Sequence, residues 1–351
     1  MKLVFKLGDD VSDLEYPTIG ESNFKEHNPT VNVSMHWSTI QPLIRQATEE
    51  YVLDYVGEEL YNHLADKFQD NGTLTDKEKR ALQLMQDTIS WYSGMVAMQT
   101  LNVTPGDMGV MQNSSKEGVA HPTSQWAFKD ALKSSLSNGD KKLERLLNYL
   151  ETNVADFEKW KTSSAYNIDT ANFLRRTKDA DQYLNLKKSR RSFVALSKWF
   201  RIAEEKYLCP ILDKITFKTY SDKFKAGEQL NDIEKQFIRL CQKVVAWKGL
   251  AEGHPHLAIS VEEDGFRVVS RTDGFQDKRN TTNAQHLKLQ QALLASAKQY
   301  GDEAEACLIS FLYQNQDTFT DWAGSDSAKT LHSKKSIKVI HSPNGRGGIM
   351  L

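Results

Sequence analysis

Apolar residues recur every three or four positions over much of the chain, a spacing that places them on one face of an α-helix. Two such stripes are matched position by position, and the residues at the polar positions between them differ. The first consists of Trp37, Ile40, Ile44, Ala47 and Tyr51, and the second of Phe193, Leu196, Phe200, Ala203 and Tyr207. Both predict a helix that turns its apolar face toward a core, and the fold class that follows is mainly α.

Further helices are predicted after each stripe. Residues 57–68 form a short one, and a long one runs from Thr75 to about 98, with Glu78 three residues after the capping threonine. Asn231 and Glu234 repeat that capping pattern before a helix that runs to about 250. Alternating apolar residues around Gly-containing turns then predict a β-hairpin in each half. Two more helices follow each hairpin, at 123–136 and 140–160, then at 283–300 and 302–322.

The second half of the chain is a diverged copy of the first. At an offset of 156 residues, positions 47–118 share 17 identities over 72 ungapped positions, where unrelated sequences would share roughly 4. Beyond Gly118 the offset becomes 162, which aligns Trp160 with Trp322. The tryptophans that recur in this way are typical of cores. The sequence therefore predicts a domain duplication, because a solenoid would show shorter repeats.

The predicted organisation is two duplicated helical bundles of about five helices each, with a projecting hairpin in each bundle and short β-strands at both ends. An arm at 1–35 contains a strand at 2–7 and packs on another domain or subunit. In order, the remaining parts are a first module at 36–160 with its hairpin at 101–118, a linker at 161–190, a second module at 191–322 with its hairpin at 257–275, and a tail at 323–351 with a terminal hairpin.

Composition narrows the class of protein without naming a partner. The net charge of -1 excludes a globally basic nucleic-acid binder, and the hydrophobic fraction of 39% suits small helical domains. The three cysteines, Cys209, Cys241 and Cys307, lie in apolar helical patterns and indicate a reducing compartment. No apolar run is long enough for a signal peptide or a membrane span. We expect a soluble protein made in a cytoplasm, with no membrane partner.

The chain contains none of the common catalytic motifs, and we expect no enzyme activity, cofactor or metal. His254 and His256 are the nearest approach to a metal site, but two histidines without a third ligand favour a surface turn. The acidic pair Glu49-Glu50 and the run 262–264 have no partner at a spacing that acid–base chemistry requires. The basic run Lys187, Lys188, Arg190 and Arg191 is suited to phosphate contacts, and the alternative interpretation is a solvated linker before a helix.

Three segments of the first half carry a family resemblance. The stretch Ile-Arg-Gln-Ala-Thr-Glu-Glu-Tyr at 44–51, the stretch at 55–61 and Leu-Leu-Asn-Tyr-Leu-Glu at 146–151 resemble the small helical head-tail connector (adaptor) proteins of tailed phages. The whole chain also resembles an uncharacterised family of phage and prophage proteins with two such modules in tandem. The second half departs from the pattern where Tyr-Val-Gly becomes Ile-Leu-Asp at 211–213.

The resemblance implies a structural virion protein, a head-tail connector that forms a homo-oligomeric ring at the portal and neck through which DNA passes. Its partners would be the portal protein and the neck or tail proteins. On this hypothesis Lys187, Lys188, Arg190 and Arg191 contact the portal or the DNA in the lumen. The alternative function is a DNA-binding or packaging accessory protein that acts through the same basic linker. An enzyme is the third hypothesis, and it would need a site built from residues far apart in sequence.

Overall fold

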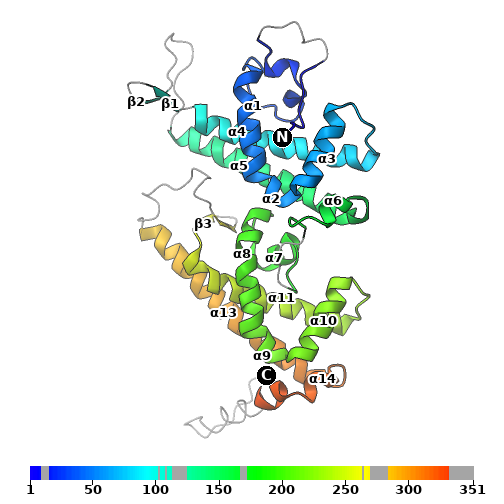
Figure 1. Ribbon diagram of the computed structural model, residues 1–351. Coiled ribbons are helices and arrows are strands. Elements are labelled where there is room, and N and C mark those ends of the chain that lie inside the picture. The colour runs from blue at the N-terminus through cyan, green and yellow to red at the C-terminus, as the bar shows by residue number, and fades with distance from the viewer. Residues whose placement is uncertain are drawn as a thin grey trace. The chain divides into compact units, whose positions relative to one another are not determined.

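The computed structural model describes residues 1–8, 16–101, 103–106, 109–112, 125–166, 172–262, 265–268 and 284–331. The described chain is mainly helical and divides into two compact units (Figure 1). Unit 1 contains the described residues up to 166 together with Lys188–Arg191. Unit 2 contains residues 172–187, Ser192–Val268 and 284–331.

Unit 1 is built around its long helix α4, which packs against α1 and α5 (Figure 1). Its apolar stripe is buried as the spacing predicts, since Ile40, Ile44 and Ala47 are fully enclosed. Its elements are α1 (Trp37–Tyr51), α2 (Leu53–Val56), α3 (Glu58–Gln69), α4 (Asp76–Leu101), α5 (Gln125–Thr152), α6 (Glu158–Lys161) and the short 3-10 turns η2 (Ile19–Glu21), η3 (Asn23–Glu26) and η4 (Val154–Asp156).

The first residues of the chain belong to the core of unit 1. Leu3, Val4 and Phe5 are buried there, and glutamine side chains meet their backbone carbonyls. Gln69 Nε2 donates to the carbonyls of Leu3 and Phe5 at 2.6 and 2.9 Å, and Gln86 Nε2 donates to that of Val4 at 2.6 Å. The predicted strand at 2–7 is therefore wrong as a whole: one isolated antiparallel bridge joins Leu7 to Ser22, and glutamine side chains satisfy the carbonyls of Leu3, Val4 and Phe5.

Unit 2 is built around α11, which packs against the long helix α13. Phe193, Leu196 and Phe200 of the second stripe are fully buried. The elements are α7 (Thr177–Leu184), α8 (Arg190–Ala203, of which the first two residues belong to unit 1), the π-helical η5 (Glu204–Leu208), α9 (Cys209–Leu212), α10 (Lys214–Ala226), α11 (Asp232–Gly253), η6 (His254–His256), α13 (Ala284–Gln314) and α14 (Thr320–Ala323).

Among the described residues, each unit has one pair of antiparallel strands after its long helix. In unit 1, β1 (Val103–Gly106) pairs with β2 (Gly109–Gln112), and in unit 2, β3 (Ile259–Glu262) pairs with β4 (Gly265–Val268). These pairs lie within the stretches 101–118 and 257–275 that the alternation singled out. The terminal hairpin predicted in the tail lies outside the described residues.

Two predicted helix breaks are absent. The helices expected at 123–136 and 140–160 are one helix, α5, up to Thr152, and those expected at 283–300 and 302–322 are one helix, α13, up to Gln314. The glycine that lies at each expected break serves close packing. A Cβ on Gly139 would lie 2.6 Å from a ring carbon of Tyr92, and one on Gly301 would lie 3.0 Å from Lys248 Cδ. A helix tolerates such a glycine where a neighbouring side chain needs the space.

Candidate functional site

The residues that stood out in the sequence as a basic run form a short strap on unit 1. We call Lys188–Arg191 the strap. A turn precedes it, in which Lys187 and Lys188 both have positive φ, at 55° and 54°. Lys187 is half-buried and Lys188 exposed, whereas Ser189 and Arg190 are only 1% and 7% exposed. The chain therefore enters the body of unit 1 at Ser189.

Arg190 is held by two glutamates of α5. Its Nε lies 3.2 Å from Glu144 Oε2, and its Nη2 lies 2.7 Å from Glu151 Oε1. The two glutamates are two turns apart, so both face the same side of α5. Burial on its own would lower the pKa of Arg190, but the charges of Glu144 and Glu151 outweigh it and raise that pKa. The result is a buried, hydrogen-bonded ion triad.

Asp140, one turn before Glu144 on α5, receives the rest of the strap. Tyr92 Oη donates to Asp140 Oδ1 at 2.8 Å, and Ser189 Oγ donates to Oδ2 at 3.2 Å. Arg191 Nη1 lies 3.7 Å from Asp140 Oδ1, and its guanidinium lies 5.0 Å from the ring centroid of Tyr51. Burial, together with the Asp140 charge, raises the pKa of Tyr92, which keeps the phenol neutral and donating.

This placement changes the interpretation of the basic run. The alternative of a solvated linker is wrong for Ser189 and Arg190, because the acidic side of α5 draws them into unit 1. In this arrangement the guanidinium of Arg190 is enclosed and cannot also meet a phosphate. Arg191 is directed toward Asp140 and Tyr51. Of the four predicted contact residues, Lys188 is the one that is exposed.

The corresponding face of unit 2 differs in exposure. Tyr207, Lys248 and Asp302 stand at the positions of Tyr51, Tyr92 and Asp140 under the offsets of 156 and 162. The Asp302 side chain is 74% exposed, whereas that of Asp140 is 4% exposed.

In unit 2 the local cation comes from α11 itself. Lys248 Nζ donates to Asp302 Oδ1 at 2.5 Å, contacts Glu305 Oε2 at 2.9 Å and lies 4.6 Å from the ring centroid of Tyr207. Burial lowers the pKa of Lys248, but its bonds to Asp302 and Glu305 outweigh that effect and raise it. The charge that the strap brings to unit 1 is thus partly supplied by an internal lysine in unit 2.

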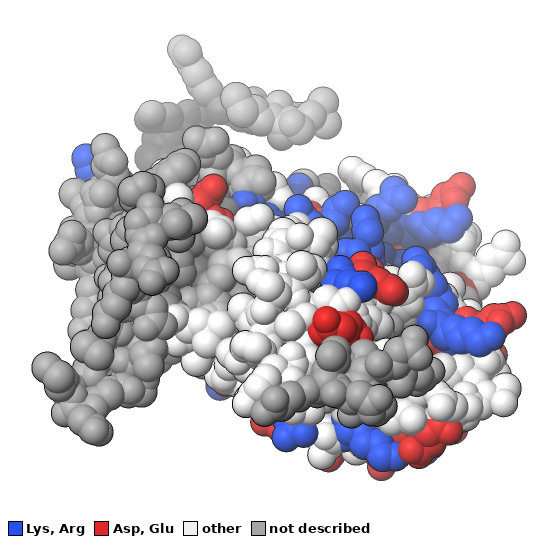
Figure 2. All heavy atoms as spheres, turned by 90° about the horizontal axis from the view of Figure 1, so that it is seen from above, with Lys and Arg blue, Asp and Glu red and all other residues white. Residues whose placement is uncertain are grey.

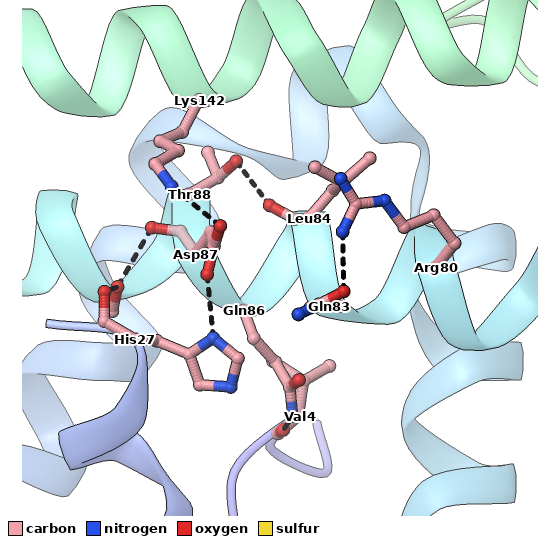
Figure 3. A network of polar contacts seen from close by, with 10 residues as sticks. Val4, His27, Arg80, Gln83, Leu84, Gln86, Asp87, Thr88 and Lys142 are labelled. Carbon is pink, nitrogen blue, oxygen red and sulfur yellow. Dashed lines mark hydrogen bonds and ion pairs between the residues drawn. The ribbon is translucent and has the colours of Figure 1, made fainter.

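A second polar network fastens the N-terminal segment to α4 and α5 (Figure 3). His27 Nδ1 lies 2.8 Å from Asp87 Oδ1, and Lys142 Nζ donates to Asp87 Oδ2 at 2.7 Å. Burial would raise the pKa of Asp87, but the bonds to His27 and Lys142 outweigh it and lower that pKa. A histidine–aspartate pair occurs in general-base catalysis. Here the nearby hydroxyl of Ser90 donates to the backbone carbonyls of His27 and Asp87, so the network ties segments together.

His254 and His256, which came nearest to a metal-binding pattern in the sequence, have different surroundings. The ring of His256 stacks on that of Trp199, with centroids 4.6 Å apart, and His254 is half-buried at the end of α11. Across the described ranges, no group of three or more histidine, cysteine, aspartate or glutamate residues could hold a metal ion. Within the same ranges, no helix is both long and apolar enough to cross a membrane.

Surface charge is mixed rather than of one sign. Figure 2 shows lysine and arginine side chains on the described part of one face, with aspartate and glutamate side chains among them. Exposed lysines of unit 1 carry acidic partners, such as Lys2 with Asp70 at 2.8 Å and Lys77 with Asp156 at 2.6 Å. Such pairing lowers the field that a phosphate backbone would meet.

Sequence reasoning missed the acidic residues that receive the strap. Asp140, Glu144 and Glu151 follow each other by one turn and then by two turns on α5, so they form a single acidic stripe. Two signals were available: this helical spacing, and the change of the two glutamates to Ala306 and Tyr313 in the second half. A stripe that is acidic in one half only points to a cationic partner in that half.

Comparison with known proteins places the chain in a family but supplies no activity. No curated protein and no solved structure matches it. A model of a family of unknown function, DUF6712, matches residues 52–170 and again residues 201–331. The two matched stretches cover most of the chain and fall one in each half. The chain therefore belongs to the DUF6712 family of unknown function.

Proposed function

We propose that the protein is a virion structural protein of the head-tail connector kind, built from two duplicated helical modules, each with a projecting hairpin. In this role the chain forms a homo-oligomeric ring at the portal and neck of a tailed phage and lets DNA pass without chemistry. The proposal includes the portal protein and the neck or tail proteins as partners. The observation that carries it is a set of internal contacts that recur in both units at constant sequence offsets.

The recurring tryptophans make the same contact in each unit. Trp160 Nε1 donates to the carbonyl of Tyr55 at 3.2 Å, and Trp322 Nε1 donates to that of Ile211 at 2.7 Å. Tyr55 and Ile211 are 156 residues apart, and the tryptophans are 162 apart. In unit 1 the bond joins α2, which follows α1, to α6 near the end of the unit. In unit 2 the bond joins α9, which follows α8 and η5, to α14. Independent folds would not place an indole on the same backbone carbonyl, so the contact supports duplication.

The long helices repeat two further contacts. Thr75 and Glu78 form a capping box on α4, with bonds of 2.9 and 3.2 Å, and Asn231 and Glu234 form one on α11, with bonds of 3.0 and 2.8 Å. These capping boxes were predicted and are confirmed.

Two glutamines occupy equivalent places deeper in the same helices. Gln86 Nε2 donates to the carbonyl of Val4 at 2.6 Å, and Gln242 Nε2 donates to that of Phe173 at 3.0 Å. In both units the glutamine of the long helix binds a non-helical segment that lies outside the matched helices. The segments around Val4 and Phe173 differ in sequence but contact the same position of the long helix, which supports equivalent modules.

Two similar modules in one chain favour closed assemblies. A ring needs a heterologous interface, in which one face of a subunit meets a different face of the next. Tandem modules that have diverged on their surfaces provide two such faces. The polar networks described above hold helices and segments together, which suits a structural role. The predicted terminal hairpin of the tail lies outside the described residues.

The experiment that tests the proposal has two stages. The purified chain is first measured by native mass spectrometry and negative-stain electron microscopy, and closed rings of one copy number are expected. Cryo-electron microscopy of virions that encode the chain should then show two helical modules per subunit directly against the portal. A monomer that stays monomeric with purified portal, or a neck that lacks this chain, would reject the connector role and leave the duplication untouched.

The alternative, a DNA-binding or packaging accessory protein, is favoured by one observation, the exposure of Lys188 at a turn beside half-buried Lys187. Two phosphate contacts would give a shallow dependence of affinity on salt, with a slope of about -2 on logarithmic axes. Fluorescence anisotropy with duplex DNA across a salt series measures it, and Lys187→Glu with Lys188→Glu should abolish binding. Binding that the double variant leaves unchanged would exclude this alternative.

A further inference from the structure

The strap on unit 1 has a sequence counterpart in the tail of the chain. The run Lys-Lys-Ser-Arg-Arg at 187–191 is matched by Lys-Lys-Ser-Ile-Lys at 334–338. Ser336 then corresponds to Ser189, Ile337 to Arg190, and Lys338 to Arg191. We propose that residues 336–338 dock on the α13 face of unit 2 in the same chain, as the strap docks on α5 of unit 1. The inference rests on the duplication proposed above and not on the connector role.

The receiving face changes in step with the segment. On α5 the positions that meet the strap are Asp140, Glu144 and Glu151. An offset of 162 turns them into Asp302, Ala306 and Tyr313 on α13. Where both glutamates are lost, the arginine they held is replaced by Ile337. An apolar side chain on alanine and tyrosine leaves no buried charge unpaired, whereas an arginine there would.

The aspartate that accepts from the strap has an equivalent in unit 2, and so do the two strap residues that contact it. In unit 1, Asp140 accepts from Ser189 and faces the guanidinium of Arg191. In unit 2 the same position is Asp302, and the tail supplies Ser336 and Lys338 as a hydroxyl donor and a cation. The aspartate is thus the receiving residue that the two helices share, and the residues that would contact it, a serine and a cation, are shared by the strap and the tail.

Exposure shows that the α13 face has room for an occupant. Asp140 and Glu144 have side chains 4% and 8% exposed beneath the strap, whereas Asp302 is 74% exposed and Ala306 is exposed. Cys307, next to Ala306, is exposed as well. Among the described residues nothing covers this side of α13 as the strap covers α5.

The glycine beneath each face is shared too. Gly139 lets the Tyr92 ring approach α5, and Gly301 lets the Lys248 stem approach α13 at the aligned position. The two faces are therefore built on the same close helix–helix contact, one backed by a tyrosine and the other by a lysine. This similarity of the two helix–helix contacts supports a similar segment docking on each face.

The tail can reach the face within its own chain. Tyr313 Oη donates to the carbonyl of Ala328 at 3.0 Å, which places the last described turn beside one end of the face. The six residues from 332 to 337 span about 20 Å when extended. Ala306 lies about 10 Å along α13 from Tyr313. The tail motif follows Trp322 more closely than the strap follows Trp160, and this shorter connection still suffices.

Disulfide trapping in the full chain tests the contact. Cys209 and Cys307 are replaced by serine, and Ile337→Cys is paired with Ala306→Cys. The matched control pairs Ile337→Cys with Lys235→Cys, an exposed position on α11. Under mild oxidation we expect an intramolecular disulfide in the first pair and little in the control, scored by non-reducing electrophoresis and peptide mass mapping. Intermolecular dimers through 306 and 337 would overturn the docking within one chain and assign the face to a second copy.

A readout on the native cysteine keeps the proposal testable if the paired variants misfold. Cys307 borders the face, so a docked segment slows its alkylation by iodoacetamide. Reversing charge with Lys338→Glu while changing Ser336→Glu should release the segment beside Asp302 and raise the alkylation rate several-fold. Lys329→Glu, on the described part of the tail, is the control and should leave the rate unchanged. Equal rates in all three proteins, or equal trapping at 306 and 235, would overturn the proposal.

Discussion

Unit 1 and unit 2 share their internal bonds and differ in what lies on their faces. The indoles of Trp160 and Trp322 meet equivalent carbonyls, and both long helices start with a capping box. The strap, in contrast, lies on unit 1 alone, where Arg190 is enclosed. Loss of a bond that closes a core leaves a buried group without a partner, which favours keeping such bonds in both units. Surface positions change because water can replace whatever was lost.

The His27 network sharpens the same contrast. Asp87 joins His27 and Lys142 in unit 1, but the aligned residue of unit 2 is Lys243. The network depends on the N-terminal segment that crosses α4, so it has no reason to persist where that segment differs. Among the contacts described above, the Asp87 network thus differs between the two units, whereas the tryptophan and capping contacts recur in both.

The largest effect should come from Arg190→Met. It leaves Glu144 and Glu151 buried without their cation, and breaking such a pair costs about 3–5 kcal/mol of unfolding free energy. Urea denaturation followed by circular dichroism measures it. Lys198→Met, at an exposed position on the same helix, is the matched control, with an expected change within about 0.5 kcal/mol. If the two variants proved equally stable, the strap would not anchor unit 1.

Neutralising the two glutamates in the Arg190→Met variant separates the contribution of their charge to stability from that of side-chain packing. Glu144→Gln and Glu151→Gln in the Arg190→Met background remove the unpaired charges and should recover a substantial part of the lost stability, because the neutral amides are cheaper to bury. No recovery would mean that the loss came from the arginine stem and not from its charge.

The next effect tests the shared core. Trp160→Phe and Trp322→Phe each leave one carbonyl without its indole donor, at a cost of about 1–3 kcal/mol. The two losses should be similar, since the contacts are equivalent, and thermal denaturation of each variant measures them. Tyr300→Phe, at a side chain in a residue 43% exposed, serves as the control. A large loss in one unit and none in the other would argue against equivalent modules.

A smaller effect is expected at the helix caps. Thr75→Ala and Asn231→Ala remove the side-chain acceptor of each capping box, which costs about 1 kcal/mol per cap. Thr75→Ser and Asn231→Ser should retain most of the stability, because serine caps a helix equally well. Loss of stability in the serine variants would show that the side chains do more than cap.

The smallest expected effect is on the pH dependence of the unfolding free energy in acid. Burial raises the pKa of Glu78, but its bonds to Lys67, the Thr75 backbone and His63 outweigh this and lower it from 4.5 to about 2. A carboxyl with a depressed folded pKa stabilises the fold above pH 4.5, and that contribution is lost as pH falls toward 2. Glu78→Gln should flatten this dependence, measured as unfolding free energy against pH. Glu234, which lacks a histidine partner, should give a smaller change.

An unchanged acid profile in Glu78→Gln would contradict the assignment, since other carboxylates would then carry the dependence. The comparison with Glu234→Gln keeps the test internal to the chain. Both carboxylates meet an equivalent lysine, Lys67 or Lys223, at 2.8 and 3.0 Å. The difference between the two variants thus isolates what His63 adds.

The amino-acid sequence by itself determined the helical class, the two stripes, the capping boxes and the alignment of the two halves. These features depend on the spacing of apolar residues and on local hydrogen bonds, which a linear pattern records. Tertiary contacts decided the rest. The sequence predicted a break between 136 and 140, whereas α5 runs through it and Gly139 leaves room for the Tyr92 ring of another helix. Gly57 and Asp213, different in sequence, both adopt positive φ at the aligned turn, at 80° and 60°.

The strap shows most clearly what the sequence left open. A run of lysines and arginines before a helix looks the same whether water or protein surrounds it. Only the folded arrangement shows that Glu144 and Glu151 of α5 meet Arg190, because those residues are about forty positions away and converge through packing. Sequence fixes which charges exist, and the tertiary structure decides which of them are neutralised inside the protein and which face its partners.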